Sequence, residues 1–350
     1  MKPTTRVFAI SILSVFGCSI ILPQTTPNPN GSTVAERLGY AANSRILIIH
    51  ANDFGMSHSV DIAIMEALEN RWVTSASVMT PCPWFPEVAQ WARAHPDADL
   101  GVHLTLNSDW TTYRWLPVSP QLKNSSLLDA DGYLPLTTAN VAVAAKAPDL
   151  EVETHAQVDK ALRLGIHLSH LDPHMGTMTS TPEMSKIYVS LGGDYHLPVL
   201  LEKLEIGIWN DMRVGIRTKN YGLQLSGEPI LLDAVIQIMP GIPKTKWIDA
   251  YEKMLAPLPP GVYQLVVHLG YDDAEMRGAT SDHPHWGAQW RQNDFDMVRS
   301  PEFQQFLKDQ GFILVSWKDL GKALPLKPSG EVPQSVTGSK SESSAQAIQH

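Results

Sequence analysis

The sequence predicts an α/β fold, specifically an irregular (β/α) barrel that forms a single domain with long loop insertions. Short runs of β-branched and aliphatic residues alternate with amphipathic segments over residues 44–326. Ionisable residues stand at or near the C-terminal ends of several of these runs, which is the edge where α/β folds build their sites. Alternation over this length favours a barrel over an open, doubly wound sheet.

The first expected strand, 45–50, is an unbroken aliphatic run, typical of a strand that is buried on both faces. It gives way to Asn52, Asp53 and Gly55, after which Ser57 can cap an apolar-periodic helix over 57–71. A carboxylate therefore lies in the turn between a strand and a helix. Asp53 is either a functional residue or a helix cap.

Further strands and helices follow in alternation. We expect strands at 73–79, 99–106, 166–171, 197–201, 230–238, 262–268 and 312–316, and helices at 86–95, 150–164, 182–191, 245–256 and 301–310. Pro182 and Pro301 each follow a capping residue, as at the first position of a helix, and Gly165 and Gly311 stand where a helix ends. Segment 107–137 is a long insertion, and such insertions are usually functional or mobile.

The N-terminus predicts export. Lys2 and Arg6 precede an apolar run over 7–17 that is too short to span a bilayer, so residues 1–18 are expected to be a signal peptide. The run ends in a sequence that resembles a bacterial lipoprotein cleavage box. We expect a periplasmic or cell-envelope protein that is lipid-anchored at Cys18 and has no other membrane contact; simple secretion is the alternative.

Composition predicts the character of the two segments that flank the folded body and excludes one class of partner. Residues 19–43 have the composition of a flexible tether, and residues 327–350 that of a disordered tail. The formal net charge is −9 and the chain has no basic cluster, which argues against a nucleic-acid partner.

Three histidine clusters join Asp53 at the ends of expected strands. His103, His174 and His268 each follow or interrupt an apolar run, and parallel strands would bring these ends to one face. Taken singly, each histidine is more often a core or loop residue. Together, Asp53, His103 and His174 form a sensible ligand set for one divalent metal ion, which can activate water and polarise a carbonyl.

Several segments resemble the successive motifs of the YdjC/ChbG family of carbohydrate deacetylases: 48–57, 73–79, 101–106, 170–174 and 267–270, with weaker matches at 261–265 and 291–295. The resemblance implies an irregular (β/α) barrel and one divalent metal ion, magnesium or zinc. It also implies hydrolysis of an N-acetyl group from an amino sugar or oligosaccharide. The family's metal ligands fall on Asp53, His103 and His174, and its proton-donating histidine falls on His268.

One departure from the family concerns the general base. The family usually has an aspartate where this chain has Asn52, and an amide cannot take a proton from water; losing a positioned base costs ~10²–10⁴-fold in rate. Asp172 is the leading substitute, although it could instead orient a ligand histidine. A slow enzyme, a relocated base and a non-catalytic carbohydrate-binding lipoprotein all remain open, as does hydrolysis of another bond, such as an ester.

Aromatic side chains near the expected loop face are candidates for substrate binding, because sugar rings stack on them. The set comprises Trp110, Tyr113, Trp115, Trp286 and Trp290, each of which could instead anchor a loop. Trp110 and Trp115, together with Arg291 from the weaker motif, are the substrate-binding residues that we expect.

Overall fold

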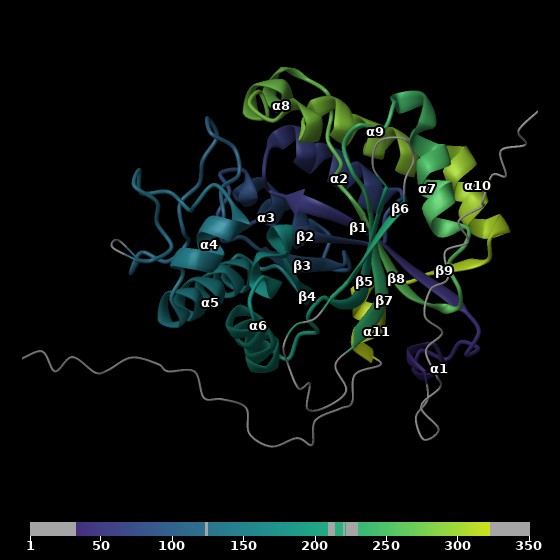
Figure 1. Ribbon diagram of the computed structural model, residues 1–350, viewed down its shortest axis with the longest axis horizontal. Coiled ribbons are helices and arrows are strands. Elements are labelled where there is room, and N and C mark those ends of the chain that lie inside the picture. Colours follow the sequence, from purple (N-terminus) through teal and green to yellow (C-terminus); the bar gives the residue numbers. More distant parts are fainter. Residues whose placement is uncertain (1–32, 123–124, 209–213, 220, 222–229, 323–350) are drawn as a thin grey trace, which may run out of the picture.

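One sheet organises the chain, and the computed structural model in Figure 1 describes residues 33–322 apart from 123–124, 209–213, 220 and 222–229. The strands run in the order β4-β3-β2-β1-β8-β7-β5-β6, with β9 also paired to β1. Their bounds are β1 Arg45–Phe54, β2 Ser75–Val78, β3 Leu100–Leu104, β4 Leu168–Pro173, β5 Leu201–Ile208, β6 Val214–Thr218, β7 Leu231–Ile238, β8 Gly261–Val267 and β9 Phe312–Leu314. The α/β prediction is confirmed.

The pairing directions decide where a site can form. Every pairing between described strands is parallel except that of β5 with β6. An isolated parallel β-bridge joins Leu171 of β4 to Val199, which lies just before β5, and so connects the β4 end of the strand order to the half that contains β5. This order is consistent with the predicted irregular barrel, and it brings the C-terminal ends of the parallel strands to one edge.

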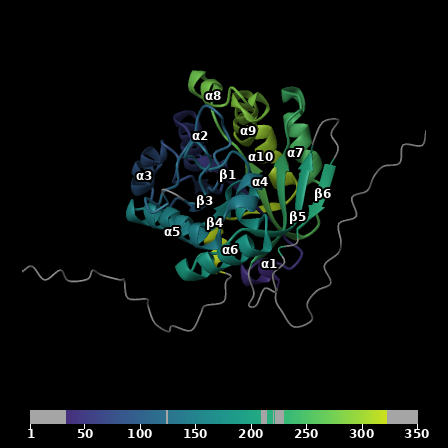
Figure 2. The same cartoon turned by 60° about the vertical axis from the view of Figure 1, so that its left-hand side comes forward.

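Helices surround the strands in both views (Figures 1 and 2). Their bounds are α1 Val34–Arg37, α2 His58–Glu69, α3 Phe85–Ala94, α4 Thr138–Ala144, α5 Ala147–Arg163, α6 Pro182–Tyr195, α7 Trp247–Leu255, α8 Ala274–Ala279, α9 Ala288–Val298, α10 Pro301–Asp309 and α11 Trp317–Lys322. Short 3₁₀ helices lie at His174–Thr179, Lys244–Lys246 and Pro284–Trp286. Among the described residues, no helix is both long and apolar enough to cross a membrane.

The two faces of β1 pack into different parts of the core. Leu47 and Ile49 belong to the main apolar cluster, whereas Ile46 and Ile48 pack in a second cluster together with Trp317 of α11. This alternation is the two-residue period of a strand. The expectation of a first strand buried on both faces is confirmed.

Apart from 3₁₀ helices, six described elements were not expected, namely β6, α1, α4, α8, α9 and α11. The strand expected at 197–201 begins only at Leu201, as β5. Three of the unexpected elements have a clear physical reason. β6 is an antiparallel edge strand with an exposed end, so it lacks the apolar run that marks the other strands. α9 buries polar as well as apolar residues and shows no amphipathic pattern. Residues 34–37, expected within the tether, form α1, because Thr33 and Glu36 make a capping box and Ala35 packs in the second cluster.

The predicted signal peptide at 1–18, with Cys18, lies outside the described residues. So do most of the predicted tether and the predicted tail at 327–350.

Candidate metal centre

Asp53 stands at the C-terminal end of β1, where the chain turns sharply into α2. Its φ of 69° lies in the left-handed region, and Gly55 follows with a φ of 101°. A Cβ at Gly55 would stand 3.3 Å from the backbone of Phe85, so both conformation and space favour glycine there. The turn holds the carboxylate of Asp53 in the interior, where only 3% of the residue is exposed.

Two imidazoles from neighbouring strands meet this carboxylate. His103 lies near the end of β3, and His174 directly follows β4. Oδ1 of Asp53 is 3.4 Å from Nε2 of His103 and 3.4 Å from Nδ1 of His174, and these two nitrogens are 3.1 Å apart. One potential ligand atom from each residue lies within 4.8 Å of the others. The structure thus brings together the three residues that were predicted as metal ligands.

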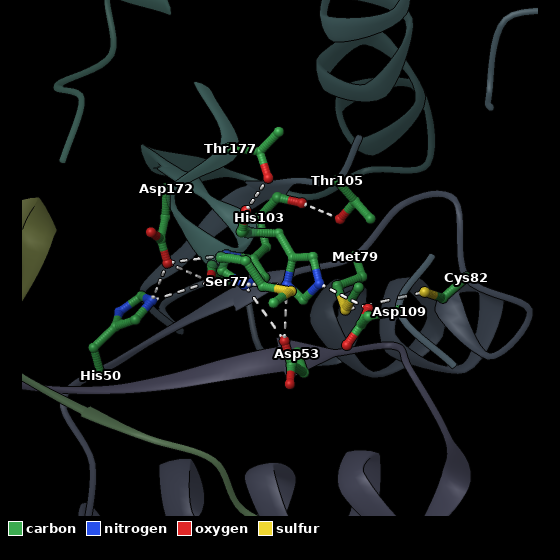
Figure 3. A network of polar contacts seen from close by, with 12 residues as sticks. His50, Asp53, Ser77, Met79, Cys82, His103, Thr105, Asp109, Asp172 and Thr177 are labelled. Carbon is green, nitrogen blue, oxygen red and sulfur yellow. Dashed lines mark hydrogen bonds and ion pairs between the residues drawn. The ribbon is translucent and has the colours of Figure 1, made fainter. Parts of the chain in front are cut away.

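The far side of each of these three residues contacts a charged partner. Arg291 donates from a guanidinium nitrogen to Oδ2 of Asp53 at 2.7 Å. Nδ1 of His103 lies 3.0 Å from Oδ2 of Asp172 (Figure 3). A carboxylate behind a ligand imidazole fixes its tautomer and raises its basicity, a common arrangement around metal ions.

His174 is held in the same way by Asp109, whose Oδ1 lies 3.1 Å from Nε2 of His174. Asp109 comes from the 107–137 insertion, so this insertion contributes a side chain to the site. Each of the two imidazoles therefore turns one nitrogen towards Asp53 and the other towards a carboxylate.

The donor set fits a divalent cation. Oδ1 of Asp53 is buried and has no hydrogen-bond partner among the described residues, as expected of an atom reserved for an ion. Asp53 is one of the three ligands, and Asp109 and Asp172 contact the two imidazoles, so three carboxylates contribute negative charge. The guanidinium of Arg291 contributes one positive charge. With neutral imidazoles the formal charge is −2, which a divalent cation would cancel. One carboxylate and two imidazoles suit zinc and other transition metals.

The pKa shifts follow from the same contacts. Burial raises the pKa of Asp53, but Arg291 and the two imidazoles outweigh burial and hold it well below its usual range. Burial lowers the pKa of His174, but Asp109 and Asp53 outweigh it and raise the pKa to about 10. The carboxylates therefore favour positive charge at this point, which either protons or a metal ion can supply.

Behind His103, Asp172 is closed off from solvent. Its Oδ2 also accepts a hydrogen bond from Ser77 at 3.0 Å and contacts Nε2 of His50 at 3.2 Å. The carboxylate faces His103 from the side opposite Asp53 (Figure 3). Of the two roles expected for Asp172, this position favours orienting a ligand histidine over replacing the base.

His268, which follows β8, is partly exposed. Its backbone N–H donates to Oδ2 of Asp294 at 2.8 Å, and its ring packs on Trp290 with centroids 4.8 Å apart. Burial lowers the pKa of His268 to about 3; Asp53 opposes this shift, while Arg291 adds to it. His268 therefore belongs to the electrostatic environment of the predicted ligands, and its imidazole is neutral near pH 7.

Asn52 precedes Asp53 in β1 and is 9% exposed. Its side-chain oxygen is buried and has no hydrogen-bond partner among the described residues. Asn52 thus stands where the resemblance places the family's usual base, and its Oδ1 makes no hydrogen bond to another described residue.

Two of the expected substrate-binding residues are placed differently from the prediction. Trp110 and Trp115 are each 2% exposed, and Trp115 donates from its indole to the carbonyl of Asn107 at 2.9 Å. Neither ring offers an open face to a sugar, so both are corrected to anchors of the insertion. Arg291 is 3% exposed and donates to Asp53, and its Nε and Nη1 have no hydrogen-bond partner among the described residues, so its role in substrate binding stays a prediction.

Two aspartates that contact residues of the site, Asp109 and Asp294, were not predicted as functional residues. Asp109 lies in an irregular segment, and Asp294 lies in α9, which was not predicted as a helix. The length of the insertion was the one signal for Asp109, because functional residues concentrate in such loops. Asp294 lies within the weaker family motif at 291–295, which was the signal for it, whereas no local pattern distinguishes Asp109 from the other aspartates.

Comparisons with known proteins identify the family of the chain. A family model described as YdjC-like protein matches residues 46–309. A carbohydrate deacetylase of Thermus thermophilus is 30% identical over 302 residues, which are 83% of this chain and 98% of the relative. A carbohydrate deacetylase of Brevibacillus brevis is 26% identical over 79% of this chain and 99% of the relative. A crystal structure from Enterococcus faecalis V583 matches with a TM-score of 0.64 and 21% identity, covering 79% of this chain and 99% of the other, and supports the fold.

Proposed function

Because the chain belongs to the YdjC-like protein family, we propose that it is a carbohydrate deacetylase, which hydrolyses the N-acetyl amide of an amino sugar or oligosaccharide with the help of one divalent metal ion. The observation that carries the proposal is the arrangement of Asp53, His103 and His174. Their ligand atoms converge, and each residue is held from behind by a charged side chain. Curated relatives that are matched over nearly their whole length bear the name carbohydrate deacetylase.

The metal ion, magnesium or zinc, would polarise the amide carbonyl and lower the pKa of the attacking water, which makes that water a better nucleophile. Asp53, His103 and His174 would hold the ion. Asp172, Asp109 and Arg291 would fix the orientation of these ligands, as their contacts on the far sides indicate.

His268 would carry the proton. Its imidazole is neutral near pH 7, because burial lowers its pKa to about 3, and a neutral imidazole has a ring nitrogen free to take up the proton of the attacking water. Water adds to the amide carbon while its proton passes to His268; the C–N bond then breaks and the same proton passes to the departing nitrogen. The immediate products are acetic acid and a free amine, which exchange a proton in water to give acetate and an ammonium group.

Asn52 fits this scheme as a hydrogen-bonding group. Its amide cannot take a proton, and Asp172 lies behind His103, so neither replaces the family's usual base. The alternative, a carbohydrate-binding protein without catalysis, is less favoured, because His268 can supply both proton transfers and the ligand arrangement is intact.

Acetate release from a panel of N-acetylated sugars and acetate esters tests the proposal, with Asn52→Asp as the informative variant. We expect the wild type to release acetate from an N-acetyl sugar in a metal-dependent manner. If the wild type releases none and Asn52→Asp releases it readily, the carbohydrate-binding alternative is correct. If only esters react, the chain is a hydrolase of another bond.

We further propose export and a lipid anchor at Cys18, a suggestion that rests on the sequence of residues 1–18. Fractionation of cells that express the wild type or Cys18→Ala tests it. Loss of the Cys18→Ala protein from the membrane fraction is the expected result, and an unchanged distribution contradicts it.

A further inference from the structure

One face of α9 holds two parts of the site. Arg291 and Asp294 are three residues apart in this helix, so their side chains leave it on the same face, and both are buried. Arg291 donates to Oδ2 of the predicted ligand Asp53 at 2.7 Å. Oδ2 of Asp294 accepts the backbone N–H of His268 at 2.8 Å. The helix therefore contacts a predicted metal ligand with one side chain and the backbone of the proposed proton carrier with the other.

The strand ladder does not fix the position of His268. β8 ends at Val267, and the N–H of His268 bonds a side chain of α9 instead of a neighbouring strand. Two residues further on, a Cβ added at Gly270 would stand 3.3 Å from Cβ of Arg291, so the chain passes close to α9. The course of the backbone through His268 therefore depends on its contacts with this helix.

The carboxylate of Asp294 is itself held from α7, which lies beside α9 (Figure 1). Its Oδ1 accepts hydrogen bonds from the indole N–H of Trp247 at 2.9 Å and from the hydroxyl of Tyr251 at 2.7 Å. Burial raises the pKa of Asp294 to about 6, while its three donors and Arg291 oppose the shift, so the carboxyl group is largely ionised near pH 7. Hydrogen bonds to an ionised carboxylate are stronger than those between neutral groups. Asp294 therefore gives the backbone of His268 a strong and buried support.

We propose that Asp294 is a positioning residue, which fixes His268 on the helix that also holds Asp53 and so sets the imidazole relative to the metal centre. The inference rests on the proposed deacetylase function and adds a residue that acts on the reaction through His268. Among the described residues, no predicted metal ligand bonds the carboxylate of Asp294. A displacement of a catalytic group by ~1 Å can cost ~10²-fold in rate, so a support of this kind matters to kcat.

Asp294→Asn is the test variant. An amide has one oxygen where the carboxylate has two, so it cannot accept from His268 on one side and from Trp247 and Tyr251 on the other. With the metal-loaded protein and N-acetylglucosamine or its β-1,4-linked dimer, we expect kcat to fall about 10- to 100-fold, while KM and the metal content stay as in the wild type. Tyr251→Phe removes one donor and keeps the ring, so its kcat should fall by less than about tenfold.

Asp99→Asn is the matched control. Asp99 is 6% exposed, and it too accepts one backbone N–H, that of Lys318, and two side-chain hydroxyls. It precedes β3, at the end of that strand opposite to His103. The substitution should lower the free energy of unfolding, as Asp294→Asn does, and leave kcat unchanged.

Two results would overturn the proposal. The first is a fall in kcat for Asp294→Asn that is no larger than the fall for Asp99→Asn, since Asp294 would then serve stability alone. The second is a loss of metal from Asp294→Asn, because its effect would then pass through the predicted ligands and not through His268.

Hydrogen exchange at the backbone amide of His268 separates this inference from the proposed function, because it needs no substrate. We expect this amide to exchange about tenfold faster in Asp294→Asn than in Asp99→Asn, the effect of one lost hydrogen bond. If no acetate is released but the exchange is faster, the deacetylase proposal fails and Asp294 still positions His268. If acetate is released and Asp294→Asn matches Asp99→Asn in both exchange and kcat, the function stands and the positioning inference fails.

Discussion

Asp172 and Asp53 lie at opposite nitrogens of one imidazole. Nδ1 of His103 is 3.0 Å from Asp172, and Nε2 is 3.4 Å from Asp53. One carboxylate can therefore orient the ring while the other shares an ion with it. The two aspartates have similar surroundings in sequence, each near the end of a strand, and differ in role because of the side of His103 on which they lie.

Asp172→Asn should weaken metal binding. The amide keeps the size of the side chain but loses the charge that holds Nδ1 of His103, so we expect the dissociation constant to rise about 10–100-fold. Competition with a chromophoric chelator measures it. Asp249→Asn, a substitution at an exposed aspartate of α7, is the control. An unchanged dissociation constant in Asp172→Asn would show that the carboxylate does not support the ligand.

Asp109→Asn should have a smaller effect on the same measurement. The side chain of Asp109 is 22% exposed, whereas that of Asp172 is 3% exposed, so water can take over part of its contact with His174. We expect the dissociation constant to rise less than about tenfold, because solvent screens a partly exposed charge. A larger loss than that of Asp172→Asn would assign Asp109 a direct role as a ligand.

The sequence alone predicted the strand, the turn and the helix around Asp53, because an unbroken aliphatic run followed by polar residues and glycine is a strong local signal. The ligand set was not derivable from spacing: 50 residues separate Asp53 from His103, and 71 separate His103 from His174. The position of these residues at expected strand ends suggested the set, and the family resemblance then fell on the same residues. Only the three-dimensional structure places them together.

The missed features share a physical cause. Asp109 lies in irregular backbone, and α9 buries Arg291, Asn293 and Asp294 among apolar residues, so neither segment has a periodic pattern. The predictions of aromatic substrate-binding residues failed for a related reason. An aromatic residue in a loop has the same sequence signature whether its ring is open to ligand or, as for Trp115, buried as an anchor.

His268→Gln should remove catalysis and retain the metal. The amide has similar size but cannot move a proton, so we expect kcat to fall about 10²–10⁴-fold. Because His268 is outside the predicted ligand set, the metal content should equal that of the wild type. Acetate release and elemental analysis of the same preparation measure both quantities. A variant that keeps its kcat would exclude His268 from the proton transfers.

The free energy of unfolding should depend on pH in a way that shows the imidazole of His268 to be neutral in the folded chain. Its pKa falls from an ordinary value of 6.5 to about 3 in the folded chain, chiefly because of burial. Between these values the unfolded chain binds a proton that the folded chain does not, so stability is lost as the pH falls below 6.5. In His268→Gln, the free energy of unfolding should decrease less between pH 7.5 and pH 5.

Urea unfolding in the presence of a chelator makes this comparison without a contribution from metal release. The difference between wild type and variant isolates His268 from the other titrating groups, including Asp294, whose buried carboxyl has a pKa raised to about 6. An equal loss of stability in both proteins would show that His268 is readily protonated in the folded state.

Metal stoichiometry tests the central claim most directly. After dialysis against zinc or magnesium and removal of free ion, elemental analysis should find about one metal ion per wild-type chain. The double variant His103→Ala/His174→Ala should hold almost none, while the control His155→Ala/His167→Ala, altered at a half-buried and an exposed histidine outside the predicted ligand set, should match the wild type. One full equivalent of metal in His103→Ala/His174→Ala would contradict the proposal that Asp53, His103 and His174 share a cation.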